Sequence, residues 1–230
     1  MTEIKFSAIL AAGGSGTRFG GEVNKVYLPY RGQPVISYSL DKFLQHPLIK
    51  EIICVYRKED EALILPLLAD KGRDSEVPLL AVPGGASRRA SVYQGLKLSS
   101  SAYVIVHDAA RPFWKPEWID ALAEVMREVP GATVAIPSPD TVKLADENGR
   151  VTATTDRTHT FLVQTPQAFH RDILLKAHET LPSEAPATDD CGMLEQIGCP
   201  VQLIPGSPRN RKLTVPEDAV WLSADTDSVL

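Results

Sequence analysis

Residues 5–25 of the chain read KFSAILAAGGSGTRFGGEVNK. The apolar run at residues 5–10 has the length of a strand and leads directly into a glycine-rich segment, a pattern typical of a buried strand in a parallel sheet. Small residues let a backbone approach a ligand closely and turn its N–H groups toward phosphate oxygens. The segment therefore predicts a phosphate-binding loop after a first buried strand, with Arg18 and Lys25 as cations on its far side.

Two familiar phosphate-binding loops are excluded by spacing. A Walker A loop ends in Gly-Lys-Ser/Thr, and the chain contains no such triplet. A dinucleotide fingerprint requires Gly-x-Gly-x-x-Gly, but the third position counted from Gly14 and Gly16 is Phe19. The second expected strand also ends in Tyr56-Arg57, where a ribose-binding acid is required. The loop is therefore of another type, and a dehydrogenase is not favoured.

Strand-like and helical patterns alternate along most of the chain. After the first strand, strands are expected at residues 51–56, 79–82, 103–107, 132–136 and 201–204, and helices at 34–45, 58–69, 87–98, 117–128, 171–179 and 189–197. Parallel strands require crossover connections, which these helices supply. The order predicts one α/β domain over residues 1–230, with a Rossmann-like, mostly parallel twisted sheet and helices on both faces.

The alternation is interrupted at residues 140–167. Short strand-like segments occur at 141–144, 151–154 and 161–164, and Asn148-Gly149 is a strong hairpin signal. No helical pattern fits there. We expect a β-arm inserted into the α/β domain, followed near the C-terminus by a short strand at 211–214 and a helix at 216–222.

Composition limits the possible partners. The 230 residues include 24 Lys and Arg against 29 Asp and Glu, a net charge of −5, and 43% are hydrophobic, as in soluble globular domains. A protein with a net negative charge does not attract the phosphate backbone of nucleic acid as a whole. Any anion must therefore bind at a local cluster of basic side chains. The apolar runs are shorter than the ~20 residues of a membrane span. We expect neither nucleic-acid nor membrane binding.

The cysteines and the N-terminus indicate the compartment. Cys54, Cys191 and Cys199 are odd in number and form no Cys-x-x-Cys pair, which argues against a disulfide framework or a structural zinc site. The first residues lack the apolar stretch of a signal peptide. A cytoplasmic location is expected.

The glycine-rich segment, residues 10–19 (LAAGGSGTRF) followed by Lys25, resembles the opening of the sugar-nucleotide and polyol-phosphate nucleotidyltransferases. Further motifs follow in order: GGASRRASV at 84–92, VHDAARP at 106–112, DTVK at 140–143, TPQ at 165–167, TDD at 188–190 and NRKLT at 210–214. Over residues 9–218 this series resembles the 2-C-methyl-D-erythritol 4-phosphate cytidylyltransferase family of the non-mevalonate isoprenoid pathway.

The resemblance implies an activity and a set of site residues. A cytidylyl group would pass from CTP to 2-C-methyl-D-erythritol 4-phosphate, giving 4-diphosphocytidyl-2-C-methylerythritol and pyrophosphate, with Mg²⁺ at Asp108 and a homodimer in which the arm completes the neighbouring site. The implied catalytic residues are Arg18, Lys25, Arg157 and Lys212. The implied nucleotide-binding residues are Ala11, Ala12, Gly13, Gly14, Gly16, Gly84, Gly85, Arg88, Ser91, Asp108 and Ala109. The implied acceptor-binding residues are Arg111, Thr141, Arg157, Thr165, Lys212 and Thr214.

The residues themselves support part of this assignment. Asp108 follows a strong strand, and open α/β sheets bind ligands at the carboxyl ends of their strands. Attack at an α-phosphorus adds charge to its oxygens, which an arginine and a lysine on one loop can stabilise. Ser87 and Asp189 also fit as helix caps, and His107 fits as a structural residue of the strand end.

Two other functions remain open at this stage: a ribitol-5-phosphate cytidylyltransferase, and an inert nucleotide-binding regulatory homologue. The chain also departs from the family pattern. Phe19 stands for the usual Met, and Asn24 and Val26 replace the Pro and Gln that flank the lysine. Residues 209–211 are more basic than usual. These changes bear on the packing of the loop and on the charge near the acceptor phosphate.

Overall fold

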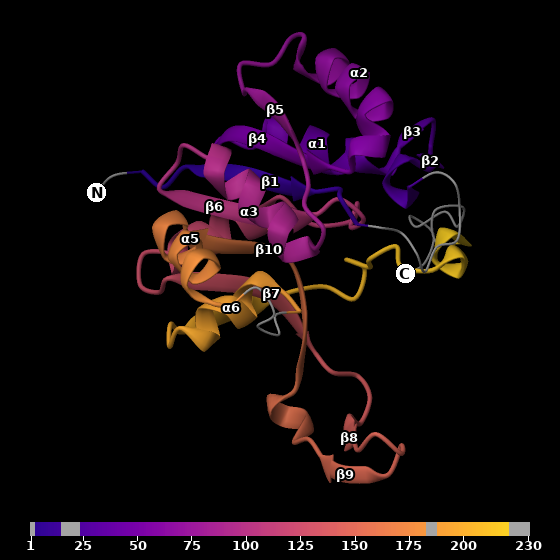
Figure 1. Cartoon of the computed structure of the whole chain (residues 1–230), viewed down its shortest axis with the longest axis vertical. Helices are drawn as coiled ribbons and strands as arrows, with labels where there is room; N and C mark the ends of the chain where they lie inside the picture. Colours follow the sequence, from indigo (N-terminus) through magenta and orange to yellow (C-terminus); the bar gives the residue numbers. More distant parts are fainter. Residues whose placement is uncertain (1–2, 15–23, 183–187, 221–230) are drawn as a thin grey trace.

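A seven-stranded sheet forms the centre of the molecule (Figure 1). The structure, a computed structural model, describes residues 3–14, 24–182 and 188–220. The strands follow the order β11-β7-β10-β6-β1-β4-β5 across the sheet. Their bounds are β1 (Phe6–Ala11), β4 (Ile49–Tyr56), β5 (Leu79–Pro83), β6 (Tyr103–Asp108), β7 (Gly131–Pro137), β10 (Phe161–His170) and β11 (Val201–Pro205). All neighbouring pairs are parallel except those of β10.

Helices cover both faces of the sheet, as predicted. One apolar cluster contains residues of α1 (Val35–Gln45), α2 (Glu61–Gly72) and α4 (Glu117–Val125). The other contains residues of α3 (Arg88–Leu98), α5 (Arg171–Thr180) and α6 (Asp190–Gln196). Strand β1 contributes to both clusters, because successive side chains of a strand point to opposite faces. Phe6, Ala8 and Leu10 pack in the first cluster and Ile9 in the second.

The prediction that residues 161–164 form a strand of the arm is wrong. Residues 161–164 were expected to be an arm strand, but they begin β10, which lies in the main sheet antiparallel to β7 and β6. Gln167 pairs with Val106 of β6 and with Thr133 of β7. The pairing explains the difference: Phe161–Val163 pair with Pro137–Ala135 of β7, and Gln167–Phe169 lie between β6 and β7, so the whole strand continues the main sheet.

The arm itself is a hairpin that projects from the body of the molecule (Figure 1). Strands β8 (Lys143–Ala145) and β9 (Val151–Thr154) pair antiparallel in a separate sheet. The N–H of Ser138 donates to the carbonyl of Thr160 at 2.9 Å and closes the base, so the arm is shorter than residues 140–167. A 3-10 turn at Arg157–His159, where no helix was expected, begins where the Asp156 side chain accepts the N–H of Thr158.

The segment after β11 also differs from the prediction. Residues 211–214 form no strand: the N–H of Leu213 donates to the carbonyl of Ala110 at 2.9 Å, and no ladder follows among the described residues. A 3-10 turn, Pro216–Ala219, takes the place of the first part of the helix expected at 216–222, and residues 221–222 lie outside the described residues. Within the described chain, no helix is long and apolar enough to cross a membrane.

We predict that His178 makes stability depend on pH. This residue of α5 is 9% exposed and stacks on Tyr93 of α3 with 5.5 Å between ring centroids. Burial, together with Arg89 and Arg88, lowers its pKa from 6.5 to about 4. Between these values only the unfolded chain is protonated, so the free energy of unfolding rises with pH by at most ~1.4 kcal/mol per unit.

The substitution His178→Phe keeps a stacking ring and removes the titrating group. Urea denaturation between pH 4 and 6.5 should show a flatter pH dependence for this variant than for the unchanged protein. An unaltered slope in His178→Phe contradicts the prediction.

Candidate active site

Asp108 lies at the carboxyl end of β6, beside the start of the glycine-rich segment. In the parallel pairing of β1 with β6, Ala11 is opposite Asp108. The N–H of Ala109 donates to the carbonyl of Ala11 at 3.1 Å, and the N–H of Ala12 donates to Val55 of β4 at 2.8 Å. Three neighbouring strand ends thus bring the glycine-rich segment and Asp108 to one place, as the order of motifs predicted.

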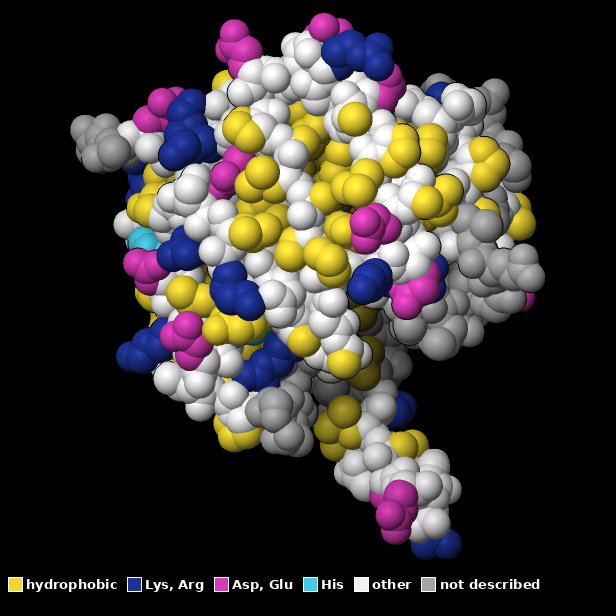
Figure 2. Space-filling model, turned by 45° about the horizontal axis from the view of Figure 1, so that its top comes forward, with side chains coloured by type: hydrophobic (Ala, Val, Ile, Leu, Met, Phe, Trp, Pro, Cys, Tyr) yellow, Lys and Arg dark blue, Asp and Glu magenta, His cyan; other side chains and the backbone are white. Residues whose placement is uncertain are grey.

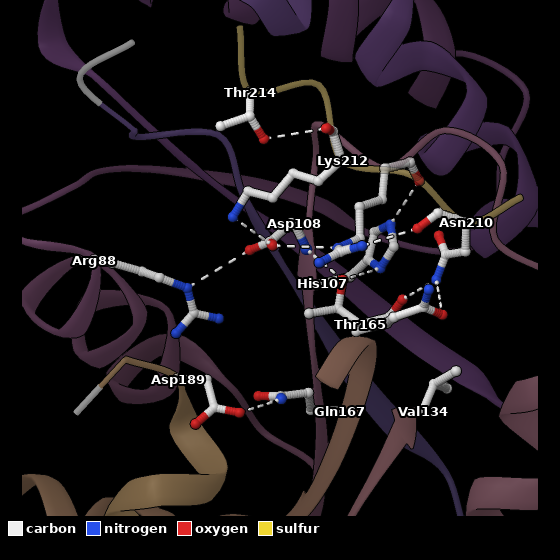
Figure 3. A network of polar contacts seen from close by, with 12 residues as sticks. Arg88, His107, Asp108, Val134, Thr165, Gln167, Asp189, Asn210, Lys212 and Thr214 are labelled. Atoms are coloured by element: carbon white, nitrogen blue, oxygen red, sulfur yellow. Dashed lines mark hydrogen bonds and ion pairs between the residues drawn. The ribbon is translucent and has the colours of Figure 1, made fainter. Parts of the chain in front are cut away.

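Cationic side chains from three separate segments surround the Asp108 carboxylate (Figure 3). Lys212 Nζ lies 2.7 Å from Oδ2, Arg111 Nε lies 3.5 Å from Oδ2, and Arg88 Nε lies 3.6 Å from Oδ1. Burial by itself would raise the pKa of Asp108, but Lys212, Arg88 and Arg111 outweigh it and hold the pKa well below its usual value. Asp108 is therefore ionised at neutral pH, and three cationic side chains surround it.

A second, deeper carboxylate holds one of these cations. Arg88 Nη1 lies 2.8 Å from Asp190 Oδ2, and the Asp190 side chain is almost fully buried at the start of α6. Burial lowers the pKa of Arg88, but Asp190 and Asp108 raise it above its ordinary value. The guanidinium therefore stays charged and bridges the two carboxylates. Because an unpaired buried charge costs several kcal/mol, this bridge fixes α3 against α6.

Thr165 and His107 hold the backbone of Asp108 and Arg111 through buried hydrogen bonds. The Thr165 hydroxyl accepts the N–H of Asp108 at 3.1 Å and lies 2.9 Å from His107 Nδ1. The other ring nitrogen of His107 is 3.1 Å from the carbonyl of Arg111, which only accepts, so Nε2 carries the hydrogen and Nδ1 accepts from Thr165. Burial lowers the pKa of His107 to about 3, so the ring is neutral. His107 is structural, as predicted.

Asn210 joins the segment that carries Lys212 to β10. Its fully buried side chain donates to the carbonyl of Thr165 at 2.8 Å and lies 3.2 Å from Gln164 Oε1. Its backbone carbonyl accepts from Arg111 Nη1 at 2.8 Å. The sequence placed Asn210 in a motif but gave it no role, because an asparagine between two arginines resembles a surface loop. Its place in the ordered NRKLT motif was the only available signal.

These residues line a cleft of about 450 Å³. Of the predicted site residues, Arg88, Asp108, Arg111, Thr165 and Lys212 meet there. The lining also includes Gln167, Asp189 and Glu195, so both cationic and acidic side chains line the cleft. Sequence reasoning missed Gln167, which donates to Asp189 Oδ2 at 2.7 Å, while Asp189 also caps α6 through the N–H of Gly192 as expected.

The turn at Gly84 and Gly85 lies against Ser91. The Ser91 hydroxyl accepts the N–H of Gly85 at 3.1 Å and donates to the carbonyl of Ser87 at 2.9 Å. A Cβ on Gly84 would lie 2.7 Å from Ser91 Oγ, and one on Gly13 would lie 3.4 Å from the same atom. A Cβ on Gly84 would clash with Ser91, whereas one on Gly13 would touch it at an ordinary contact distance, so the turn and the glycine-rich segment pack on one side chain. Ser87 caps α3, as predicted.

Other predicted residues stay apart from the cleft or cannot be placed. Thr141 and Arg157 are exposed on the arm and are not among the described residues that line the cleft. Thr214 donates to the carbonyl of Lys212 within its own segment at 3.1 Å. Lys25 begins a 3-10 turn (Lys25–Tyr27). Arg18 and Gly16 lie outside the described residues.

Asp108 is the carboxylate that could hold a divalent cation. Among the described residues, no three His, Cys, Asp or Glu side chains are grouped as metal ligands. Mg²⁺ is usually bound by one or two carboxylates, with phosphates and water completing its six ligands. Oδ2 of Asp108 is paired with Lys212, whereas Oδ1 has Arg88 at the longer distance of 3.6 Å. One carboxylate oxygen plus nucleotide phosphates fits Mg²⁺; a site made by the protein alone does not.

A glycine-rich segment lies at the end of one strand, and the Asp108 carboxylate, surrounded by cationic side chains, lies at the end of the next. This arrangement is typical of α/β proteins of the nucleotidyltransferase class. A family model described as 2-C-methyl-D-erythritol 4-phosphate cytidylyltransferase matches residues 6–225. The chain is 39% identical over 220 residues to the protein of that name from Desulforamulus reducens, covering 94% of both, and 37% identical to that of Bacillus licheniformis, covering 96% and 95%. The chain therefore belongs to the 2-C-methyl-D-erythritol 4-phosphate cytidylyltransferase family.

Solved structures agree with this assignment. The 4-diphosphocytidyl-2C-methyl-D-erythritol synthase of Anaerococcus prevotii aligns with a TM-score of 0.83 and 31% identity, covering 96% of this chain and 95% of that one. The 2-C-methyl-D-erythritol 4-phosphate cytidylyltransferase of Francisella tularensis aligns with a TM-score of 0.76 and 27% identity, covering 95% and 99%. The fold is thus shared along nearly the whole chain.

We predict that Asn210→Ala lowers the free energy of unfolding by about 1–3 kcal/mol, because the buried carbonyl of Thr165 loses its donor. Urea denaturation at pH 7 measures the change. Asn148→Ala removes the same side chain from an exposed position on the arm and should change stability by less than about 0.5 kcal/mol. Equal effects of the two substitutions contradict the role given to Asn210.

Proposed function

We propose that this protein transfers a cytidylyl group from CTP to 2-C-methyl-D-erythritol 4-phosphate, producing 4-diphosphocytidyl-2-C-methylerythritol and pyrophosphate. One observation carries the proposal: Arg88, Arg111 and Lys212 converge on Asp108 next to the glycine-rich segment. Two phosphorylated substrates must approach each other closely in this reaction, and only a local group of cations offsets their repulsion in a protein of net charge −5. The named relatives favour methylerythritol phosphate over ribitol phosphate as acceptor.

The chemistry is an in-line displacement. A phosphate oxygen of the acceptor bonds to the α-phosphorus of CTP, and the bond from that phosphorus to the oxygen bridging to the β-phosphate breaks, so pyrophosphate leaves. Lys25, with Arg18, stabilises the charge that develops on the α-phosphate oxygens, and Lys212 and Arg111 hold the acceptor phosphate. The catalytic contribution is positioning and charge stabilisation, with no covalent enzyme intermediate.

Mg²⁺ belongs to the proposal as the cofactor. Asp108 Oδ1 would hold it together with triphosphate oxygens. When bound, Mg²⁺ neutralises charge on the triphosphate and favours departure of pyrophosphate. Lys212, paired with the other carboxylate oxygen at 2.7 Å, keeps Asp108 ionised and oriented for this role.

A homodimer in which the arm completes the neighbouring site is the proposed assembly. Thr141 and Arg157 flank the strands of the hairpin, which projects from the body of the molecule (Figure 1), and neither is among the described residues that line the cleft. Leu144 and Val151 of the hairpin are 52% and 61% exposed, and apolar side chains gather where the arm leaves the body (Figure 2). A second copy would cover these side chains and place Arg157 near its acceptor phosphate. A cytoplasmic location is also proposed, supported by the odd number of cysteines and their spacing.

We predict that Lys25→Ala lowers kcat by about 100-fold or more, because one cation that stabilises the transition state is removed. Pyrophosphate release from CTP and methylerythritol phosphate with Mg²⁺ measures the rate. Lys58→Ala, at an exposed lysine before α2, should keep the full rate. Ribitol 5-phosphate replaces the acceptor in a parallel assay, and faster release with it contradicts the proposed substrate. A near-normal rate in Lys25→Ala contradicts the mechanism.

We predict that two inactive variants, Lys25→Ala and Arg157→Ala, restore activity when mixed and allowed to exchange subunits. Half of the dimers are then mixed, and one of their two sites has both side chains, so about one quarter of the normal rate returns if the arm acts across the dimer. If the arm served the site of its own chain, no mixed dimer would contain an intact site. Absence of recovery after verified exchange contradicts the shared site.

A further inference from the structure

We propose that Asn24 is a positioning residue for Lys25: its side-chain amide, held by Asp60 and Arg57, clasps the two ends of the glycine-rich segment and fixes the backbone from which the lysine extends. This inference rests on the proposed role of Lys25 in cytidylyl transfer. It concerns a position at which the chain departs from the family pattern, and the three residues lie outside the Asp108 cleft.

The clasp is a single buried side chain with two acceptors. Asn24 is 4% exposed, and its Nδ2 donates to the carbonyl of Ala12 at 3.0 Å and to Asp60 Oδ2 at 2.9 Å. Both partners only accept, which fixes the orientation of the amide. Ala12 directly follows β1 and Asn24 directly precedes Lys25, so one amide joins the beginning and the end of the segment that carries the glycines.

Asp60 is held in turn by the end of the neighbouring strand. Arg57 follows β4 and contacts both carboxylate oxygens, with Nε 2.8 Å from Oδ2 and Nη2 2.7 Å from Oδ1. Asp60 is 3% exposed, and burial would raise its pKa, but the hydrogen bonds from Arg57 and Asn24 outweigh burial and lower it. The carboxylate is therefore an ionised, immobile acceptor, and the amide of Asn24 is fixed to the sheet.

The clasp also determines where Lys25 begins. Asn24 Oδ1 accepts the N–H of Val26 at 3.4 Å, and the carbonyl of Asn24 accepts the N–H of Tyr27 at 2.9 Å. Val26 is buried in the apolar core on the α1 face. Lys25 is thus held on one side by a buried amide and on the other by a buried apolar side chain. Because the backbone of Lys25 is fixed, its ammonium group can reach only a small region.

The backbone of Asn24 explains how this arrangement relates to the proline usual in the family. Asn24 has φ −63° and ψ 131°, and a proline ring fixes φ near −65°. Proline would set the same backbone angle through its ring, whereas asparagine sets it through hydrogen bonds to Ala12 and Asp60. Asn24→Pro therefore removes the amide but keeps the backbone conformation, whereas Asn24→Ala removes the amide and supplies no ring in its place.

This difference provides the test. Steady-state kinetics of pyrophosphate release should show kcat lowered about tenfold or more in Asn24→Ala with KM for CTP within about threefold, because misplacing a catalytic group affects the transition state. Asn24→Pro should keep kcat within about threefold of normal. A purely structural role predicts instead that both variants lose the same amount of stability and that neither changes kcat in its folded fraction. Ser75→Ala, which removes a hydroxyl that closes a turn far from the site, is the control for a lost turn bond.

The kinetics of these variants test the positioning role of Asn24 separately from the proposed function. Normal kcat in Asn24→Ala overturns the inference, as does an Asn24→Pro variant as slow as Asn24→Ala. If Asn24→Ala does not fold, Asn24→Ser serves: its small polar side chain leaves room for water but lacks the amide that donates to both Ala12 and Asp60, so a normal kcat in it is equally contradictory. If the unchanged protein releases no pyrophosphate from CTP and acceptor, the proposed function fails, and that result is distinct from either outcome.

Discussion

The carboxylate of Asp108 is buried and ionised at the same time, and only surrounding cations make this combination stable. Desolvation of a carboxylate costs several kcal/mol, which Lys212 at 2.7 Å and the two arginines at 3.5 and 3.6 Å offset together. These cations come from positions 88, 111 and 212, so the pairing can form only when the sheet has brought α3, the loop after β6 and the segment after β11 together. The site is therefore a consequence of the completed fold.

Buried polar side chains hold these segments at the strand ends. Asn210 fixes the Lys212 segment to β10, His107 connects Thr165 to the carbonyl of Arg111, and Asp190 holds Arg88. The hydrogen bonds of each side chain compensate for the water that its partners lose on burial. Removing one such side chain leaves a buried polar group without a partner, which costs about 1–3 kcal/mol. Because hydrogen bonds are directional, these side chains restrict the segments to one arrangement, whereas apolar packing alone would allow several. The glycine-rich segment follows the same principle through Asn24 and Asp60.

Local patterns were sufficient to predict β1, β6, the capped start of α3 and the mostly parallel sheet, because apolar period, capping and crossover rules act over short distances. The ordered motifs also predicted the meeting of Asp108, Arg111, Thr165 and Lys212. The placement of β10 was not predicted, since residues 161–164 read as an arm strand until their pairing with β7 is known. The bridge from Arg88 to Asp190 and the contacts of Asn210 join residues 45 to 102 positions apart. No local pattern encodes such contacts.

The central claim is that one group of cations around Asp108, together with Lys25, receives two phosphorylated molecules. A crystal structure with CTP, Mg²⁺ and methylerythritol phosphate bound tests it most directly. The account predicts the α-phosphorus of CTP between the backbone of Gly13 and Gly14 and the Lys25 ammonium group, with the acceptor phosphate on the side of Lys212 and Arg111. A triphosphate bound elsewhere, with Lys25 and Lys212 directed toward unrelated surfaces, would contradict it.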